Sequence, residues 1–132
     1  MRVYRSHFQP SEHLDRPYVA IGVNAWGADT DEEAEFVSSS HKLAFSNFIT
    51  NNRGKTPIPV QNAQEYIAPH ALPQVIRMIS RSVYGSQQSL QQQLSQLVEQ
   101  YNLDEVIVTN MIHNPAKRIE SFEITAAALK SI

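Results

Sequence analysis

The spacing of hydrophobic and polar residues predicts an alternation of strands and helices. Residues 18–26 and 105–109 carry apolar side chains at both odd and even positions, which is typical of parallel strands covered on both faces. Between and beyond these runs, apolar residues recur every three or four positions, as on one face of an amphipathic helix. Because strands and helices alternate and such crossovers are right-handed, we predict the α/β class with a parallel sheet.

Local signals place the start of each long helix. Thr30 and Glu33 form a capping box, and the neighbouring acidic residues suit the positive end of a helix dipole. Ser86 is a good N-cap for a second helix, and Asn114 before a proline begins a third. Asparagine and glycine at 51–54 end the first helix. The side chains predicted to face inward are Ala34, Val37, His41, Phe45 and Phe48 in the first helix, Leu90, Leu94, Leu97, Val98 and Tyr101 in the second, and Ile119, Phe122, Ala126 and Leu129 in the third.

The middle of the chain is predicted to be irregular. Residues 55–73 contain four prolines and show no period, which indicates a long excursion. A short helix over 73–81 and a very short strand at 83–84 follow it. The residues expected to face inward in the short helix are Val75, Ile76 and Ile79. No linker or repeat divides the chain, so residues 1–132 are predicted to form a single domain.

Composition limits the function classes. Apolar residues make up 42% of the chain and charged residues 18%, and the formal net charge of −2 gives no electrostatic reason to expect nucleic acid or an anionic membrane. The chain has no cysteine, which excludes disulfides, thiolate metal sites and thiol nucleophiles. The longest apolar run is too short to span a bilayer, and the first residues contain no signal-peptide hydrophobic segment. We therefore expect a soluble cytoplasmic protein.

Candidate site residues follow the predicted strands. Parallel α/β sheets bind ligands in the loops that leave the carboxyl ends of their strands. Asn24 and Trp26 occupy this position in the first strand, and His113 follows the last. Trp26 could form the floor of a pocket for an aromatic ligand, or it could belong to the core. His113 is either a site residue or an exposed loop histidine. Gly85 and Ser86 could hold an anion at a helix N-terminus, or Ser86 simply caps that helix.

Three other features are explained without a ligand. The run at 53–56 is similar to the end of a phosphate-binding loop, but Ile49 stands where that motif needs a glycine. The acidic cluster at 29–35 matches no calcium loop and suits a helix N-terminus. His41 lies on an apolar stripe, which favours a hydrogen-bonded, partly buried residue over a ligand. No Ser-His-Asp arrangement or matched carboxylate pair is recognisable, so the catalytic residues stay unknown and no metal is predicted.

Several motifs, in order along the chain, resemble a known family. They are Tyr-Arg-Ser-His-Phe-Gln-Pro-Ser-Glu at 4–12, Arg-Pro-Tyr-Val-Ala-Ile-Gly-Val-Asn at 16–24, Ala-Asp-Thr-Asp-Glu-Glu-Ala at 28–34, Ser-Val-Tyr-Gly-Ser at 82–86, Asp-Glu-Val-Ile-Val-Thr at 104–109 and Arg-Ile-Glu-Ser-Phe-Glu at 118–123. Their order and spacing resemble the later part of bacterial luciferase-like flavin-dependent monooxygenases. That family folds as a TIM barrel, so the resemblance implies a partial (β/α)8 barrel: the last three βα units, with helices packed on one side of parallel strands. A complete barrel takes about 250 residues, so the resemblance also implies a C-terminal portion that lacks most of the flavin site.

The same resemblance implies an oxidoreductase chemistry. In that family, reduced FMN supplied by a flavin reductase reacts with O2 and oxidises an aldehyde or another small organic substrate, while the protein orients the flavin and keeps the pocket dry. This chain would supply pocket wall and be inactive, or nearly so, by itself. The residues expected to bind the cofactor or line the pocket are Asn24, Trp26, Gly85, Ser86, Thr109, Asn110 and His113. The run Met-Ile-His-Asn at 111–114 departs from the aromatic-Asp-His sequence that the family often has there.

Two alternatives of other classes stay open. An open partial barrel leaves a strand edge and an apolar sheet face uncovered, so the chain could be a non-catalytic module that forms a homo-oligomer, with residues 18–26 as the candidate edge. It could instead be a small-molecule or anion-binding domain that uses the helix terminus at Gly85 and Ser86. Flavin binding distinguishes the monooxygenase reading from the self-association module.

Overall fold

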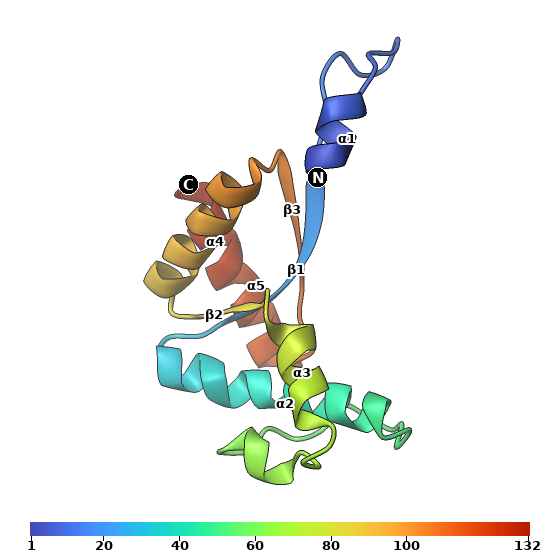
Figure 1. The fold of residues 1–132 in the computed structure, drawn as a ribbon. Coiled ribbons are helices and arrows are strands. Elements are labelled where there is room, and N and C mark those ends of the chain that lie inside the picture. Colours follow the sequence, from blue (N-terminus) through green and yellow to red (C-terminus); the bar gives the residue numbers. More distant parts are fainter.

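Three short parallel strands form the sheet of this fold. The computed structural model describes residues 1–132, and its strands are β1 (Ala20–Gly27), β2 (Val83–Gly85) and β3 (Glu105–Thr109). They lie in the order β2-β1-β3 (Figure 1). The first half of β1, from Ala20 to Asn24, pairs with β3, and the second half, from Ala25 to Gly27, pairs with β2. The predicted α/β class with a parallel sheet is confirmed.

Each residue of β1 therefore has a strand partner on one side only. A barrel of consecutive βα units would place the second strand between the first and the third, whereas here β1 lies in the middle. β2 has three residues and pairs with β1 only beyond the end of the β1–β3 ladder. Over residues 20–24, β1 keeps an open edge on the side away from β3.

The strands are less buried than predicted. β1 begins at Ala20 rather than at residue 18, because the Val19 N–H donates to the Asp104 carboxylate at 2.8 Å before the ladder starts. β1 is buried mainly toward its end, and β3 alternates between exposed and half-buried positions. The expectation of two covered faces is therefore wrong for β3 and for the first half of β1. Ile107 is among the apolar side chains left exposed.

Six helical segments connect and flank the strands. They are α1 (Arg2–His7), α2 (Asp31–Ile49), the 3-10 helix η1 (Ala63–Tyr66), α3 (Leu72–Ile79), α4 (Gln87–Tyr101) and α5 (Pro115–Lys130). The predicted N-caps are confirmed, because Thr30, Ser86 and Asn114 each accept a hydrogen bond from a backbone N–H in the first turn. The unpredicted α1 is tied to the end of α4, where Arg5 Nη2 donates to the Tyr101 carbonyl at 2.7 Å. No helix in the fold combines the length and the apolar character needed to cross a membrane.

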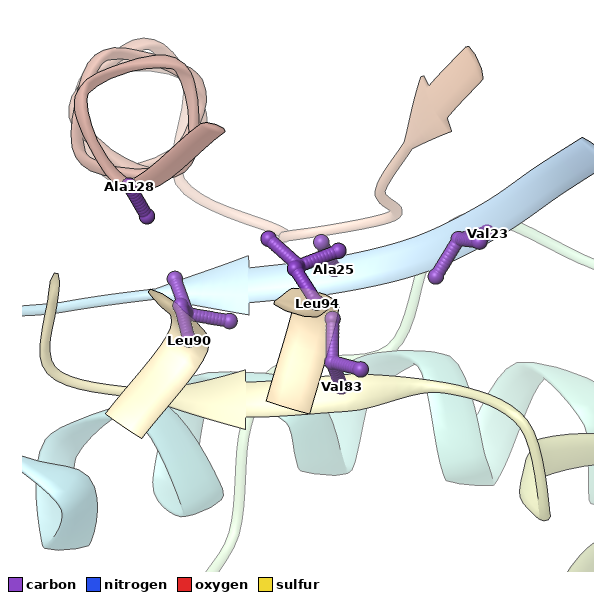
Figure 2. Close-up of a cluster of buried hydrophobic side chains, with 6 residues drawn as sticks. All are labelled: Val23, Ala25, Val83, Leu90, Leu94 and Ala128. Atoms are coloured by element: carbon purple, nitrogen blue, oxygen red, sulfur yellow. The ribbon is translucent and has the colours of Figure 1, made fainter. Parts of the chain in front are cut away.

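The main core lies where α4 and α5 cover one face of the sheet. Its six buried side chains are Val23, Ala25, Val83, Leu90, Leu94 and Ala128 (Figure 2). Leu90 and Leu94 are fully buried, as the stripe along α4 predicted. A Cβ on Gly27 would lie 3.0 Å from the Ile124 side chain and 3.1 Å from that of Leu90. Glycine at this position therefore lets α5 and α4 approach the end of β1 closely.

α2 packs on the opposite face of the sheet, near its carboxyl end. Because side chains alternate along a strand, Trp26 points away from the face that carries Val23 and Ala25. It is buried against Val37 of α2 and against Ile112. Figure 2 accordingly shows α2 on the other side of β1 and β2 from α5. The predicted packing of helices on one side is therefore wrong, because a tryptophan at this position needs an apolar cover that α2 provides.

The excursion after α2 folds back onto that helix. The Val60 N–H donates to Ser39 Oγ at 2.8 Å, which fastens the excursion to the middle of α2. Ile67 and Val75 are buried in a third apolar cluster between η1, α3 and α2. The predicted short helix is confirmed as α3, but Ile76 is half exposed instead of facing inward.

Of the four residues predicted to face inward in α5, Leu129 packs against the core, and the other three do not. Ile119 and Phe122 are 62% and 39% exposed, and the helix turns Ser121 and Thr125 toward the sheet instead. These short side chains bring the helix close to β1, and the Ser121 hydroxyl accepts a hydrogen bond from the Gly27 N–H at 2.8 Å. Apolar periodicity missed this face because two of its buried residues carry hydroxyl groups. Two other residues predicted to face inward are also exposed, Ala126 and, at the end of α2, Phe48.

Candidate functional site

Neighbouring strands bring polar side chains together at their carboxyl ends. Asn24 of β1 lies opposite Thr109 of β3, and Thr109 Oγ1 donates to Asn24 Oδ1 at 3.4 Å. Asn24 Nδ2 donates in turn to Ser82 Oγ, just before β2, also at 3.4 Å. Asn24 is half-buried and Thr109 is exposed. Two residues of the predicted set thus form a polar pair across the sheet, at the edge where parallel strands bind ligands.

Asn110 follows β3 and links the strand end to α5. Its Nδ2 donates to Ser121 Oγ at 3.4 Å, and the same oxygen accepts from the Gly27 N–H. The other amide atom, Asn110 Oδ1, is buried and has no hydrogen-bond partner. An unpaired buried acceptor costs about 1–3 kcal/mol, so such an atom needs an explanation, and a group that completes the site supplies one.

Trp26 and His41 form a buried aromatic pair between β1 and α2. Their rings meet edge to face with centroids 5.1 Å apart, and Phe45 packs on the far side of the imidazole at 4.5 Å. Trp26 is 1% exposed, so the structure places it in the core rather than on an open pocket floor. Trp26 Nε1 and His41 Nδ1 both lack a hydrogen-bond partner. Burial lowers the pKa of His41 to about 4, which keeps the imidazole neutral at neutral pH.

The position of His41 corrects one prediction. The residue is more deeply buried than expected, at 3% exposed, and the hydrogen bond predicted for it is missing at Nδ1. Its aromatic neighbours cover the ring but offer that nitrogen no partner. The pair Trp26 and His41 therefore adds two unpaired buried polar atoms beside the strand-end amides.

His113 is placed differently from the other candidates. Its side chain is exposed, and Nδ1 lies 2.9 Å from the Thr56 carbonyl. Because a carbonyl only accepts, Nδ1 donates and the hydrogen bond joins the loop after β3 to the excursion. His113 therefore fastens one loop to another, whereas Asn24, Thr109 and Asn110 gather at the strand ends.

The anion position predicted at Gly85 and Ser86 is filled by the chain itself. Asp31 Oδ1 accepts from the Ser86 N–H at 2.7 Å, and Asp31 Oδ2 accepts from Ser89 Oγ at 2.9 Å. These hydrogen bonds, led by that from the Ser86 backbone, hold the pKa of Asp31 below its usual value. Gly85 has φ +141°, and a Cβ there would lie 2.7 Å from Asp31 Oδ1. A carboxylate of α2 thus takes the place of an external anion at the start of α4, which argues against this terminus as a ligand site.

A second carboxylate of the acidic cluster joins α2 to α5. Lys117 Nζ lies 2.7 Å from Glu33 Oε1 and 2.9 Å from Glu120 Oε2. Hydrogen bonds to Glu33 and then to Glu120 raise the pKa of Lys117. Together with Asp31, Glu33 shows that the acidic cluster caps α2 and connects it to its neighbours.

Known proteins match nearly the whole chain. The uncharacterized protein YddN of Bacillus subtilis is 32% identical over 94% of this chain and 37% of its own length. A protein of Escherichia coli K12 named luciferase-like monooxygenase is 30% identical over the same shares. The chain is similar in sequence to the C-terminal part of luciferase-like proteins.

The chain spans somewhat more than a third of the length of these relatives. No protein-family model matches it. Its fold is also found in the crystal structure of apo-MsnO8, with a TM-score of 0.76 and 22% sequence identity, over 98% of this chain and 40% of that one. The solved structure therefore supports the observed arrangement of strands and helices.

Two hollows flank α2. One, of about 650 Å³, lies between α2, η1 and α3 and is lined by the carboxylates of Glu32, Glu35 and Glu65 together with Lys42. The other, of about 470 Å³, lies between the end of α2 and the excursion and contains no carboxylate. The two hollows therefore differ in the charge that they present.

Three contributors to the strand-end region were absent from the predicted set. Ser82 and Ser121 hold the amides of Asn24 and Asn110, and Asp31 fills the terminus at Ser86. Ser121 lies in the motif at 118–123, but its neighbours in that motif gave no sign that it faces the sheet. Asp31 was interpreted only as a cap of its own helix, because its contact with α4 joins residues far apart in sequence.

Proposed function

We propose that this chain forms part of an FMN-dependent monooxygenase and contributes one wall of its flavin and substrate site. The observation that carries the proposal is the pair Asn24 and Thr109, which places polar groups of neighbouring parallel strands where α/β enzymes bind their ligands. Homology to an Escherichia coli protein named luciferase-like monooxygenase supports the reaction class. An aldehyde or another small organic molecule is the proposed substrate, and a flavin reductase is the proposed partner.

The proposal extends to the architecture of the whole protein, a (β/α)8 barrel that ends with the βα units of this chain. The three strands are parallel, as a barrel requires, and one edge of β1 over 20–24 has no strand beside it. Ile107 and Thr109 are exposed on the face opposite α4 and α5, in the part that α2 leaves uncovered, and this part would then look into the barrel. Because β1 lies between β2 and β3, further strands would join beside residues 20–24 of β1 or at the free side of β3.

The residues present suit the ring system of a flavin better than its phosphate. Asn110 Oδ1 is an unpaired acceptor, and Asn24 and Thr109 add an amide and a hydroxyl at the same edge of the sheet. The helix terminus that could have bound phosphate is occupied by Asp31, so the phosphate contacts would come from outside this chain. When bound, reduced FMN supplies the electrons that activate O2. The strand-end amides would orient the ring, and the buried side chain of Trp26 would help to exclude water.

Flavin titration tests the proposal in the chain itself. We expect FMN to bind more weakly than about 100 μM, because the phosphate contacts are missing. Flavin fluorescence, recorded with oxidised and reduced FMN, measures this affinity. Micromolar binding by the chain alone would contradict an incomplete site.

A chimera tests the contribution of this chain to a complete site. The preceding part of the Escherichia coli luciferase-like monooxygenase, joined to this chain, is expected to bind FMN and to consume O2 when reduced flavin is supplied. Asn110→Ala in the chimera should weaken flavin binding about tenfold, whereas Asn52→Ala, at an exposed loop position, should leave it unchanged. A chimera that folds but binds no flavin would disprove the proposed function.

Self-association is a second candidate, supported by the open edge of β1. Unpaired strand edges and exposed apolar faces favour pairing with another chain, and both occur together here at residues 20–24 and Ile107. Size exclusion with light scattering is expected to show a homo-oligomer. Ile107→Lys should shift the protein toward monomer, whereas Ile76→Lys, at an equally exposed site on α3, should not. A monomer at high concentration would contradict this candidate.

A further inference from the structure

The hollow at the end of α2 has the size and lining of a small-molecule site. Its volume of about 470 Å³ lies within the range of about 300–1,000 Å³ typical of ligand pockets. Phe45 and Phe48 of α2 form one wall, while Met78 of α3 and Met111 from the loop after β3 contribute apolar side chains from other parts of the chain. Four separate segments of the chain therefore meet at one apolar groove.

The charged groups of this groove are both cations. Arg53 and Lys55 line it, and neither has a carboxylate within ion-pair distance. The Arg53 guanidinium lies 5.2 Å from the centroid of the Phe48 ring, which places positive charge directly beside the apolar wall. The charged residues that line the other hollow beside α2 are three glutamates and one lysine. In a chain with a net charge of −2, this groove is a local site of uncompensated positive charge.

The backbone that carries the two cations is fixed at both ends. At one end, the turn after α2 is closed by the Asn52 N–H, which donates to the Asn47 carbonyl at 2.8 Å. At the other end, the Thr56 carbonyl is held by His113 at 2.9 Å. Such restraint lowers the entropic cost of placing charges around a ligand. The hydrogen bond of His113 therefore holds the rim of the groove in place.

We propose that this groove binds an organic anion in which an acidic head group is joined to an apolar aromatic or aliphatic body. The body would lie against Phe48, Met78 and Met111, and the head group would meet Arg53 and Lys55. The run at 53–56, which lacks the glycine of a phosphate-binding loop, would act as the cationic rim. The groove is separate from the strand-end amides and requires no flavin, so the proposal is independent of the proposed monooxygenase function.

Methyl-labelled methionine offers a direct test in the unmodified chain. Of its three methionines, Met78 and Met111 line the groove and Met1 does not. Phenylbutyrate is expected to shift the methyl resonances of Met78 and Met111 with a Kd of about 1 mM or tighter, while Met1 stays unshifted. Phenylbutanol, which has the same apolar body without the charge, and inorganic phosphate, which has charge without the body, should both bind at least about tenfold more weakly. Equal affinity for phenylbutanol, or shifts confined to Met1, would overturn the proposal.

Paired variants test the cations. Arg53→Gln with Lys55→Gln should weaken phenylbutyrate binding about tenfold or more, and the fold should survive because both side chains are exposed. Arg2→Gln with Lys130→Gln removes the same charge at exposed positions elsewhere and should leave the affinity unchanged. An equal loss of affinity in both double variants would mean that overall charge, and not the groove, controls binding. An unchanged affinity in both would mean that Arg53 and Lys55 do not contact the ligand. Either result contradicts the proposal.

Discussion

The two faces of the sheet are built differently. On the face covered by α4 and α5, six buried aliphatic side chains pack together without a polar side-chain atom among them. The buried polar atoms that lack a partner lie on α2 or at the carboxyl ends of the strands: Trp26 Nε1, Ser40 Oγ, His41 Nδ1 and Asn110 Oδ1. The six aliphatic side chains follow the rule of maximum apolar burial, whereas the four unpaired atoms leave hydrogen-bonding capacity unused at a cost in stability. The aliphatic core and the unpaired polar atoms therefore occupy different parts of the fold, and Asn110 connects them through its contact with Ser121 of α5.

The largest expected effect belongs to the apolar face. Leu94→Ala should lower the free energy of unfolding by about 3 kcal/mol, because it removes a fully buried side chain and leaves a cavity. Leu97→Ala, at a half-buried position of the same helix, should cost about half as much. Urea denaturation followed by circular dichroism measures both. If the two variants unfold at the same midpoint, the apolar face does not carry the stability that the comparison assigns to it.

The second-largest effect on stability is expected at Gly85, where Asp31 of α2 contacts the start of α4. Gly85→Ala is expected to destabilise the protein by about 2 kcal/mol, because φ is +141° and the new Cβ would collide with Asp31 and Ser89. Gly22→Ala, whose Cβ would meet nothing within 4 Å, should change the free energy of unfolding by less than about 0.5 kcal/mol. Thermal or urea unfolding of both variants separates the two cases. Equal effects would show that Asp31 does not sit at the start of α4.

The buried His41 on the polar face should make the free energy of unfolding depend on pH. The pKa of His41 is about 4 in the folded protein and 6.5 when unperturbed, so the unfolded state binds the extra proton between these values. The contribution of His41 to stability is therefore complete above pH 6.5 and is lost as pH falls toward 4. His41→Phe should remove this loss, measured as the urea midpoint at pH 7 and at pH 4.5. The lowered pKa of Asp31 acts in the same direction, but only below its usual value of 3.8. An unchanged pH profile in His41→Phe would contradict the burial of a neutral imidazole.

The smallest effect is expected at the junction of strand end and α5. Ser121→Ala should cost about 1 kcal/mol, because the buried Gly27 N–H and the Asn110 amide lose their shared acceptor. Ser131→Ala, which removes an exposed hydroxyl at the end of α5, should have almost no effect on the unfolding midpoint. If Ser121→Ala is equally silent, the hydroxyl does not bridge the two elements.

Interactions within a single helix turn could be predicted from the sequence, whereas contacts between residues far apart in the sequence could not. The caps at Thr30, Ser86 and Asn114 were predicted because a side chain that bonds its own first turn needs no information from elsewhere. The face of α5 was not, because Ser121 is buried through a hydrogen bond to Gly27, which lies 94 residues away. Asp31 illustrates both cases. Its place in the first turn of α2 was evident, while its contact with Ser86, 55 residues later, was not.

The candidate site divides in the same way. Asn24 was predicted from the rule that parallel strands present ligand-binding groups at their carboxyl ends, whereas Thr109 and Asn110 were predicted from the family resemblance. The structure places all three at the strand ends. Whether they hold a cofactor stays a prediction. Trp26 points to the face of the sheet opposite Val23 and Ala25, so α2 covers it. The deep burial of His41 follows from its contact with Trp26. No periodicity within either element indicated which helix would cover which face.

The pairing of β1 has a consequence for how the chain is made. Asn24 is synthesised 85 residues before its partner Thr109, and β2 contacts only the last three residues of β1. During translation, residues 20–24 of β1 cannot form their ladder with β3 until β3 has left the ribosome. Contacts of such long sequence separation form slowly, and an exposed strand is prone to wrong pairing in the meantime. Nascent chains that stop before residue 105 should accordingly be the species that chaperones retain longest.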